Sequence, residues 1–588
     1  MPLWIRPGDT YKLWIELGPS VRPDEQPIST SSYPKSVIQL KVALFTFANE
    51  LQVSGADVSE FDLETTESES PPRDRTASSR GLVPSRLLDK RVAFLVKAPA
   101  RAGKHRIRCN VYFNNALVQS RLIYVRVRRL PLMIERFLRS IADPLRELSH
   151  RPRMAASRID FSLSRTLDPH QLEPLGSPRL SMILNDNEDG THTLRLLGNN
   201  FKADASFDGM ELQDLTDGLR GVLRQTAWGS REPWKAGFQY RYADLNIEKL
   251  ESDLTTLAVK GYRFFDNIIN RFIDADEIKE FTDLMKEPGL VQLALKHSAS
   301  LVLPAAMIYD YPLDTGAPRL RLCNLFRANM SSKDTFLGDT PCFRGSCPNR
   351  DDLEVVCPGG FWGFRHSLGM PLSVAKGTSA PLVLECASGP HLAIAVSTDP
   401  QFTMRAQHEI ALKRLLADDG WHYCATRNSV PHLLTNTSVH VVYFYCHGGM
   451  SGSTPFLLVG QPGEAGITRD NLRSWKVNWV KPRPLVFING CHTAALEPKT
   501  ALNFVSGFVE TAKAAGVIGT EITVFEPLAS AFAEDCLRRF IQRGDEIGKA
   551  VRDARLTLLK AGNPLGLVYI PYVVPTLRLG DSVDKPES

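Results

Sequence analysis

The sequence predicts an α/β protein in which a sheet covered by helices on both faces is preceded by an all-β sandwich. Residues 1–130 alternate strand-like runs with turn residues and show no helical periodicity. From about residue 176 onward, near-continuous apolar strands alternate with helical stretches, which is typical of a parallel sheet buried on both faces. The 588 residues, 43% of them apolar and 23% charged, suffice for about two to four globular domains.

The first predicted domain, residues 1–130, is a β-sandwich that we interpret as a recognition or assembly module. Its candidate strands are residues 11–17, 37–47, 92–97, 104–113 and 117–126. Asn114 and Asn115 separate the last two strands by a short turn, which predicts a β-hairpin. The polar insert at residues 54–80 predicts a long loop.

Residues 131–175 are interpreted as a basic helical connector that is interrupted by Pro144 and Pro152. Its arginines are typical of a solvated helical face. The whole chain has 70 Lys and Arg against 65 Asp and Glu, so nucleic acid is not indicated as a partner. No stretch is apolar enough for a membrane span or an export signal, and we therefore expect a cytoplasmic protein.

Residues 176–430 predict a mixed layer of strands and helices that adjoins the sheet of residues 431–580. A turn-rich loop at residues 185–190 predicts a hairpin, and residues 301–308 and 392–397 predict strands. Four cysteines in this region, which could together bind a structural zinc ion, are Cys323, Cys342, Cys347 and Cys357. Their spacing lacks a paired C-x-x-C, so free cysteines are the favoured interpretation and no cofactor is expected.

The candidate catalytic part, residues 431–580, has two buried strands that end in a histidine and a cysteine. Residues 438–446 lead into His447, and residues 485–489 lead through Gly490 into Cys491. Parallel sheets place ligands at the carboxyl ends of their strands, where both residues lie. A histidine can take the proton of a cysteine thiol and return it to a leaving amine, so the pair predicts a dyad for acyl transfer.

The backbone N–H groups of Gly448 and Cys491 are the expected oxyanion hole, because glycine lets its amide turn inward without a side-chain clash. The histidine precedes the cysteine by 491 − 447 = 44 residues, close to the ~50-residue spacing of caspase-like enzymes. Cys446 and His492 each lie one position away from a candidate, so strand alternation points them in the opposite direction.

Four segments of the chain resemble one family of peptidases. They are residues 357–366 (CPGGFWGFRH), 445–449 (YCHGG), 485–494 (LVFINGCHTA) and 516–521 (GVIGTE). These segments resemble the CHAT branch of the caspase-like (clan CD) cysteine peptidases, over residues 180–580 approximately. The resemblance implies a caspase-like sheet, Cys491 as the nucleophile and His447 as the general base.

The resemblance also places the segment after residues 517–518 near the substrate cleft, and we expect Asn489, Glu521 and Glu526 to line the substrate pocket. Carboxylates there would favour a basic side chain beside the scissile bond. The alternative is that both glutamates are solvated or belong to the first turn of a helix after Pro527. Residues 567–574 predict an edge strand, and residues 581–588 a tail.

The leading interpretation is a CHAT-type cysteine endopeptidase that cleaves a protein partner, and the resemblance suggests a bacterial signalling or defence setting. A protein activator would act through the amino-terminal domain. The first alternative is a catalytically silent platform that keeps the caspase-like fold. The second is an intracellular thiol acyltransferase on the same dyad, although no phosphate-cradling glycine loop is evident.

Overall fold

The computed structural model describes residues 4–16, 37–64, 91–128, 155–164, 172–230, 240, 242, 246–272, 275–296, 301–373, 381–436, 438–451, 454–491, 502 and 504–580. The chain divides into two compact units, Met1–Leu172 and Glu173–Ser588, and each is considered by itself. The predicted tail, residues 581–588, lies outside the described residues.

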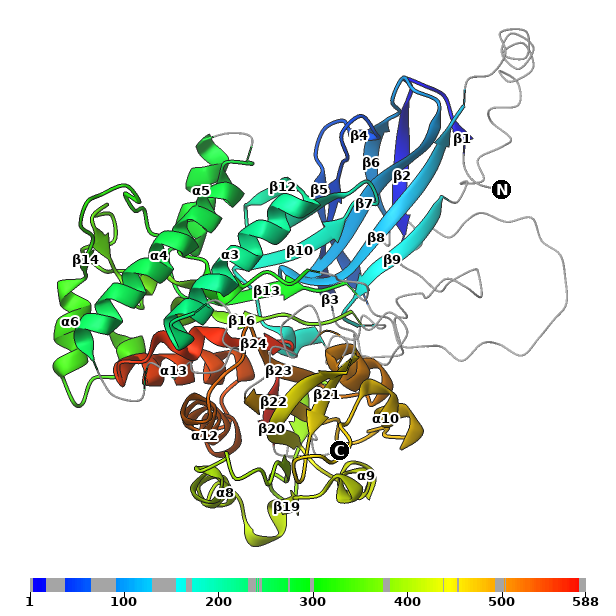
Figure 1. Ribbon diagram of the computed structural model, residues 1–588. Coiled ribbons are helices and arrows are strands. Elements are labelled where there is room, and N and C mark those ends of the chain that lie inside the picture. Colours follow the sequence, from blue (N-terminus) through cyan, green and yellow to red (C-terminus); the bar gives the residue numbers. More distant parts are fainter. Residues whose placement is uncertain are drawn as a thin grey trace, which may run out of the picture. The chain divides into compact units, whose positions relative to one another are not determined.

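The first unit is built from two sheets (Figure 1). One has six strands in the order β1-β8-β7-β3-β5, with β9 paired to β8, and the other has the order β2-β6-β4. The strands are β1 (Trp4–Ile5), β2 (Thr10–Glu16), β3 (Val37–Phe45), β4 (Gln52–Val53), β5 (Val58–Glu64), β6 (Arg91–Lys97), β7 (Gly103–Phe113), β8 (Ala116–Val127) and β9 (Ala156–Ser162). All pairs except β1–β8 are antiparallel. The sandwich arrangement of the two sheets stays a prediction.

The predicted hairpin is confirmed by strands β7 and β8. Phe113 and Ala116 are paired across the turn, and the two residues between them, Asn114 and Asn115, have φ values of +46° and +64°. Positive φ at both central positions defines the turn that matches the twist of the flanking strands, and asparagine tolerates this conformation better than most residues.

Two parts of this unit differ from the prediction. Val58–Glu64, inside the predicted loop, forms strand β5 and pairs with β3, whereas residues 65–80 of that loop are not described. Ala156–Ser162, inside the predicted helical connector, forms strand β9 and pairs with β8. Both are edge strands and carry many polar residues. Their low apolar content is why the sequence pattern did not predict them as strands.

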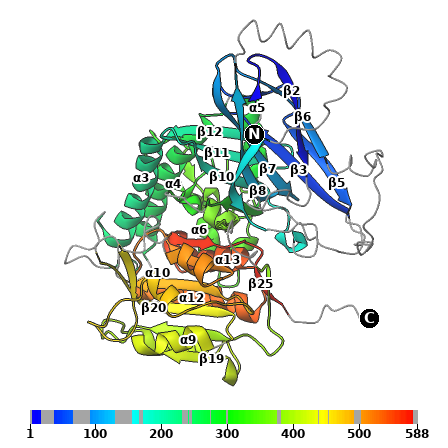
Figure 2. The ribbon, with the colours of Figure 1, turned by 90° about the vertical axis from the view of Figure 1, so that its right-hand side faces the viewer.

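The second unit contains a five-stranded sheet, a seven-stranded sheet and two pairs of short strands (Figure 2). The five-stranded sheet consists of β12 (Lys202–Asp208), β11 (Thr191–Leu197), β10 (Leu180–Asp186), β13 (Leu290–Ala294) and β16 (Ser367–Gly369). The seven-stranded sheet consists of β19 (Trp421–Cys424), β18 (Leu392–Val396), β20 (Val441–Ser451), β22 (Leu485–Cys491), β23 (Gly516–Thr520) and β24 (Tyr569–Tyr572), with β21 (Thr454–Leu458) paired to β20. The short pairs are β14 (Arg321–Leu322) with β15 (Val355–Val356), and β17 (Val383–Glu385) with β25 (Arg578–Gly580).

The α-helices with described bounds in this unit are α3 (Gly209–Trp228), α4 (Ile247–Ile269), α5 (Ala275–Met285), α6 (Asn324–Ser331), α7 (Trp362–Arg365), α8 (Arg405–Lys413), α9 (Val430–Asn436), α10 (Arg469–Ser474), α12 (Glu526–Gln542) and α13 (Ile547–Lys560). Shorter 3-10 turns are η2 (Glu173–Leu175), η3 (Ala305–Met307), η4 (Leu337–Asp339), η5 (Pro358–Gly360), η6 (Asp418–Gly420), η7 (Arg427–Ser429) and η10 (Pro564–Val568), and η9 (Gly507–Thr511) is a π-helix. The predicted hairpin around residues 185–190 is confirmed by β10 and β11. The predicted strand at residues 301–308 is wrong, because this segment forms the 3-10 turn η3 after Pro304.

The seven-stranded sheet is parallel from β19 to β23, and β24 joins its edge in the antiparallel direction. Side chains of β20 alternate between two covered faces. Tyr445 hydrogen-bonds to Ser530 of α12, whereas Phe444 packs on Phe508 of the π-helix, with ring centroids 5.6 Å apart. This alternation explains the unbroken apolar run of the strand, since both faces are buried.

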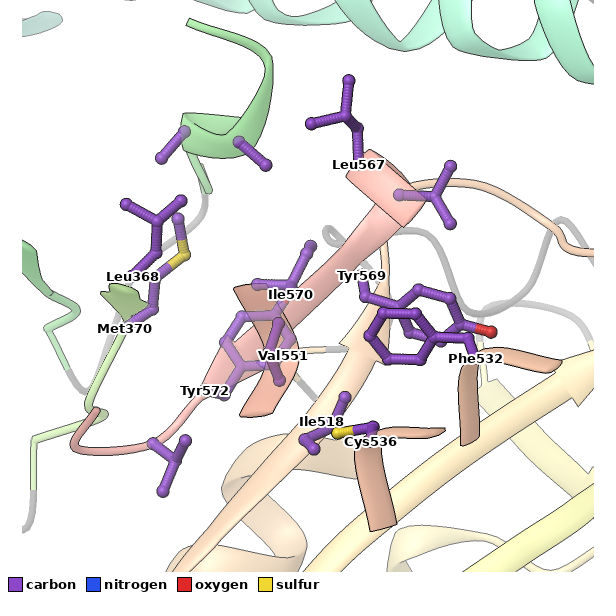
Figure 3. Packing of buried hydrophobic residues seen from close by; sticks show 14 of the residues in the cluster. Leu368, Met370, Ile518, Phe532, Cys536, Val551, Leu567, Tyr569, Ile570 and Tyr572 are labelled. Atoms are coloured by element: carbon purple, nitrogen blue, oxygen red, sulfur yellow. The ribbon is translucent and has the colours of Figure 1, made fainter. Parts of the chain in front are cut away.

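The core between α12, α13 and the sheet is shown in Figure 3. Phe532 of α12 stacks on Tyr569 of β24, with ring centroids 3.5 Å apart and planes 5° from parallel. The Tyr569 hydroxyl in turn donates a hydrogen bond to the side-chain oxygen of Asn489 in β22, at 3.0 Å. The core therefore fixes β22 two residues before Cys491.

Candidate active site

Strands β20 and β22 place His447 and Cys491 side by side. The two residues are register partners in neighbouring parallel strands, at the last paired position of that ladder. Neighbouring strands lie about 4.8 Å apart. At this spacing, a histidine and a cysteine side chain on adjacent strands can form a hydrogen bond with each other. For Cys491 the structure defines the backbone position.

The His447 ring is held by an acid and an aromatic ring from the turn after β18. Its Nε2 lies 3.2 Å from Oδ2 of Asp399, and the side chains of both residues are 14% exposed. Phe402 covers the ring at a centroid distance of 4.6 Å. The three side chains form a cluster at the carboxyl end of the sheet, and the carboxylate fixes the ring orientation.

The turn that carries Asp399 is tied to the sheet. The Gln401 N–H donates to Asp399 Oδ1 at 2.8 Å, and the Asp399 N–H donates to Ser397 Oγ at 3.3 Å. The Ser397 N–H donates to the Tyr445 carbonyl of β20 at 2.9 Å. Because each carboxylate oxygen has its own partner, Asp399 is preset to face His447.

The sequence did not single out Asp399 or Phe402. Their position in the sequence could have identified them. Both residues closely follow the predicted strand at residues 392–397, and so they lie at the same end of the sheet as His447 and Cys491. Asp399 lies in a turn-forming sequence next to Pro400, where an aspartate is also expected for local turn bonds, and this obscured its second role.

Gly448 and Gly449 follow His447 in β20 and pair with Leu457 and Phe456 of β21. The Phe456 ring lies directly over Gly449, where an added Cβ would approach it to 2.1 Å. A larger residue at position 449 would therefore displace this ring. The oxyanion-hole role of the Gly448 and Cys491 N–H groups stays a prediction.

Asn489 is fully buried, and all of its amide groups are bonded within the protein. Its Nδ2 donates to the Tyr443 hydroxyl at 2.8 Å and to the Ala529 carbonyl at 2.7 Å, and its Oδ1 accepts from Tyr569. This bonding differs from the substrate contact expected from the sequence. The amide instead anchors β22 against α12.

The two glutamates expected in the substrate pocket are also buried. Oε2 of Glu521 accepts from Arg220 Nε at 2.9 Å, and the two side chains are only 1% and 5% exposed. Glu526 begins α12, and it accepts from the Tyr445 hydroxyl at 2.8 Å and from the Met404 N–H at 2.9 Å. Residues 521–524, which precede α12, are buried. Both carboxylates therefore have partners within the protein.

No protein-family model matches the chain. A probable protease of Vitiosangium sp. (strain GDMCC 1.1324) is 38% identical over an alignment of 598 positions, which covers 98% of this chain and 75% of that protein. Two crystal structures of the Saccharomyces cerevisiae separase–securin complex, at 3.0 and 2.6 Å resolution, are 11% and 12% identical and have TM-scores of 0.34 and 0.35. They cover 68% and 70% of this chain, and the chain spans 30% and 31% of the matched chains.

Proposed function

The chain belongs to the same family as the probable protease of Vitiosangium sp., and from this premise we propose that it is a cysteine endopeptidase. Cys491 is the nucleophile and His447 is the general base. The observation that carries the proposal is the register of β20 and β22, which sets these two residues side by side at the carboxyl ends of their strands.

The proposed reaction is acyl transfer to a thiol. His447 takes the Cys491 proton, the sulfur attacks the carbonyl carbon of the scissile peptide bond, and the negative charge moves to the carbonyl oxygen. The N–H groups of Gly448 and Cys491 would stabilise that oxygen. The C–N bond breaks as His447 returns the proton to the leaving amine, and water then hydrolyses the thioester.

Asp399 completes the arrangement as a positioning residue. Its carboxylate faces the histidine ring at 3.2 Å, so it stabilises the imidazolium that forms when His447 holds the proton. A platform that only binds partners has no need of a carboxylate aimed at this histidine. This contact favours the enzyme over a catalytically silent caspase-like protein.

The finer assignments belong to the same proposal. The motifs at residues 445–449 and 485–494 support a CHAT-type, caspase-like peptidase, with a protein as its substrate. The first unit, Met1–Leu172, would recognise the substrate or a protein activator in a bacterial signalling or defence setting. A cytoplasmic location would keep the thiol reduced. Within the described residues, no helix is both long and apolar enough to cross a membrane.

Site-resolved alkylation tests the proposal without a known substrate. The full chain is treated with iodoacetamide at neutral pH, and each cysteine is followed by mass spectrometry. Cys491 should react much faster than buried Cys446, and His447→Ala should slow Cys491 alone. If His447→Ala leaves the Cys491 rate unchanged, the dyad is wrong and the silent platform is favoured.

Turnover is tested with a library of peptides derived from a whole proteome. The wild type should cleave a defined set of sequences, and Cys491→Ala should cleave none. Cys446→Ala is the matched control, because it removes a neighbouring thiol from β20 without removing the nucleophile. Cleavage by purified Cys491→Ala would contradict the assignment.

A further inference from the structure

Four cysteines that are distant in a loop-rich segment meet in one buried cluster. Cys323 precedes α6, Cys342 and Cys347 lie in the turns after η4, and Cys357 follows β15. All four sulfurs lie within 4.8 Å of one another, and each residue is buried. The sequence favoured free cysteines because the spacing is irregular, but folding brings the four side chains to one point.

The separations match the edges of a tetrahedron around one metal ion. Sγ of Cys323 lies 3.9 Å from that of Cys342 and 3.7 Å from that of Cys347, and the latter two are 3.8 Å apart. A zinc–sulfur bond of about 2.3 Å places tetrahedral ligands about 3.8 Å from each other. A disulfide would instead need about 2.05 Å, so none of these three pairs is bonded.

The separations also exclude a larger inorganic centre. An iron–sulfur cluster holds several metal ions and sulfides between its thiolates, so its ligand sulfurs lie farther apart than those of a single ion. Four thiolates around one ion leave no open coordination position, which is typical of a structural site.

The surroundings supply polar groups that suit a thiolate centre. Asn349 Nδ2 donates to Cys323 Sγ at 3.3 Å, and the Arg350 N–H donates to the Cys347 carbonyl at 3.1 Å. The Arg350 side chain is 7% exposed, stacks on Tyr311 at 5.0 Å, and its Nη1 has no hydrogen-bond partner among the described residues. Four thiolates and one Zn²⁺ carry a net negative charge, and a donor to a sulfur, such as the Asn349 amide, stabilises bound thiolates.

The segment lacks the regular structure that would otherwise hold it together. Between residues 320 and 358 the only elements with described bounds are two strands of two residues, one helix of eight and one 3-10 turn. Cys357 continues into η5, where a Cβ on Gly359 would lie 1.8 Å from the Cys342 carbonyl. The backbone at Gly359 therefore lies very close to the backbone at Cys342. A metal ion bound by the four cysteines would hold these two segments together.

We propose that Cys323, Cys342, Cys347 and Cys357 bind one structural Zn²⁺ ion in a tetrahedral, all-thiolate site. The ion joins the ends of a segment of 357 − 323 + 1 = 35 residues. It also fixes the cluster against Tyr309, whose hydroxyl accepts from the Cys357 N–H at 3.2 Å. The site is separate from the dyad and does not depend on the proposed peptidase activity.

The metal content of the full chain tests this site directly. Protein produced with zinc in the medium and purified without a metal-binding tag or chelator is analysed by inductively coupled plasma mass spectrometry. We expect about one zinc per chain, in both the wild type and Cys491→Ala. X-ray absorption at the zinc edge should show four sulfurs at about 2.3 Å. Zinc well below one per chain, iron in place of zinc, or nitrogen or oxygen ligands would overturn the proposal.

Variants then assign the ligands. Cys347→Ser should lose most of the zinc, whereas Cys536→Ser should keep it, although Cys536 is at least as buried. A second measurement uses the wild type, so it does not depend on the folding of Cys347→Ser: a mercurial reagent releases the zinc, and a colorimetric chelator counts it. Release should parallel modification of the four clustered cysteines, identified by mass spectrometry. Full zinc retention in Cys347→Ser, or release that follows Cys491 modification, would refute the assignment.

Discussion

Replacing Asp399 by asparagine tests whether His447 works with a carboxylate partner. The change keeps the size and the turn-forming character of the side chain but removes its charge. Asp399→Asn should therefore fold normally and lose the stabilisation of the imidazolium that forms during proton transfer. The loss should appear in kcat, because Asp399 is not proposed to touch the substrate.

The magnitude follows from the geometry. At 3.2 Å and an effective dielectric constant of about 20, two unit charges interact by about 5 kcal/mol. Hydrogen bonds to charged groups have a net value of about 1.5–3 kcal/mol, because solvation of both groups is lost. Since each side chain is only 14% exposed, we take the upper end of that range. About 3 kcal/mol corresponds to a roughly hundredfold loss of kcat.

The assay compares cleavage of a wild-type substrate peptide by three variants. Asp399→Asn should show the loss, Asp399→Glu should recover part of it, and Asp418→Asn, which changes an exposed aspartate in η6, should match the wild type. Thermal unfolding of each variant separates catalysis from folding. If Asp399→Asn stays within about threefold of the wild-type kcat, or if its loss is explained by unfolding, the carboxylate does not assist His447.

Three further predictions concern the dyad, a buried ion pair and a buried histidine. Cys491→Ala should abolish cleavage, and Cys446→Ala should retain it and cost about 1 kcal/mol of stability, as measured by urea unfolding. Glu521→Gln should destabilise the second unit by about 3–5 kcal/mol, because it removes the buried charge that faces Arg220 and leaves only the largely exposed Asp217, at 3.8 Å. Arg220→Met in the same chain should restore part of the loss in urea unfolding. Burial beside Arg365 holds the pKa of His366 well below its ordinary value. The unfolded chain therefore binds the extra proton as the pH falls below about 6.5, and stability should fall there by up to about 1.4 kcal/mol per pH unit, a slope that His366→Gln should remove.

The side-by-side placement of His447 and Cys491 could be predicted from the sequence because its signals are local. Residues 438–446 and 485–489 are apolar on both faces, so they had to be buried strands, and their carboxyl ends had to share one edge of the sheet. The Asn114–Asn115 hairpin was equally local, since its turn chemistry lies in two consecutive residues.

The environment of the glutamates could not be predicted in this way. A carboxylate just after a strand has the same sequence pattern whether it faces a substrate or a buried arginine. Glu521 is buried because Arg220 reaches it from α3, 301 residues earlier in the chain. The sequence identified the four clustered cysteines but could not show that they meet, because they come from separate turns and have no regular spacing.

The contacts of Glu526 connect the candidate active site to the fold behind it. Glu526 accepts from Tyr445 in β20 and from Thr403 and Met404, which directly follow Phe402. The same turn carries Asp399, so one buried carboxylate at the start of α12 holds β20 and the turn that orients His447. The position of the histidine is thus set by β18, β20 and α12 together. These bonds hold Glu526 inside the protein, whereas the sequence had suggested a place for it in the substrate pocket.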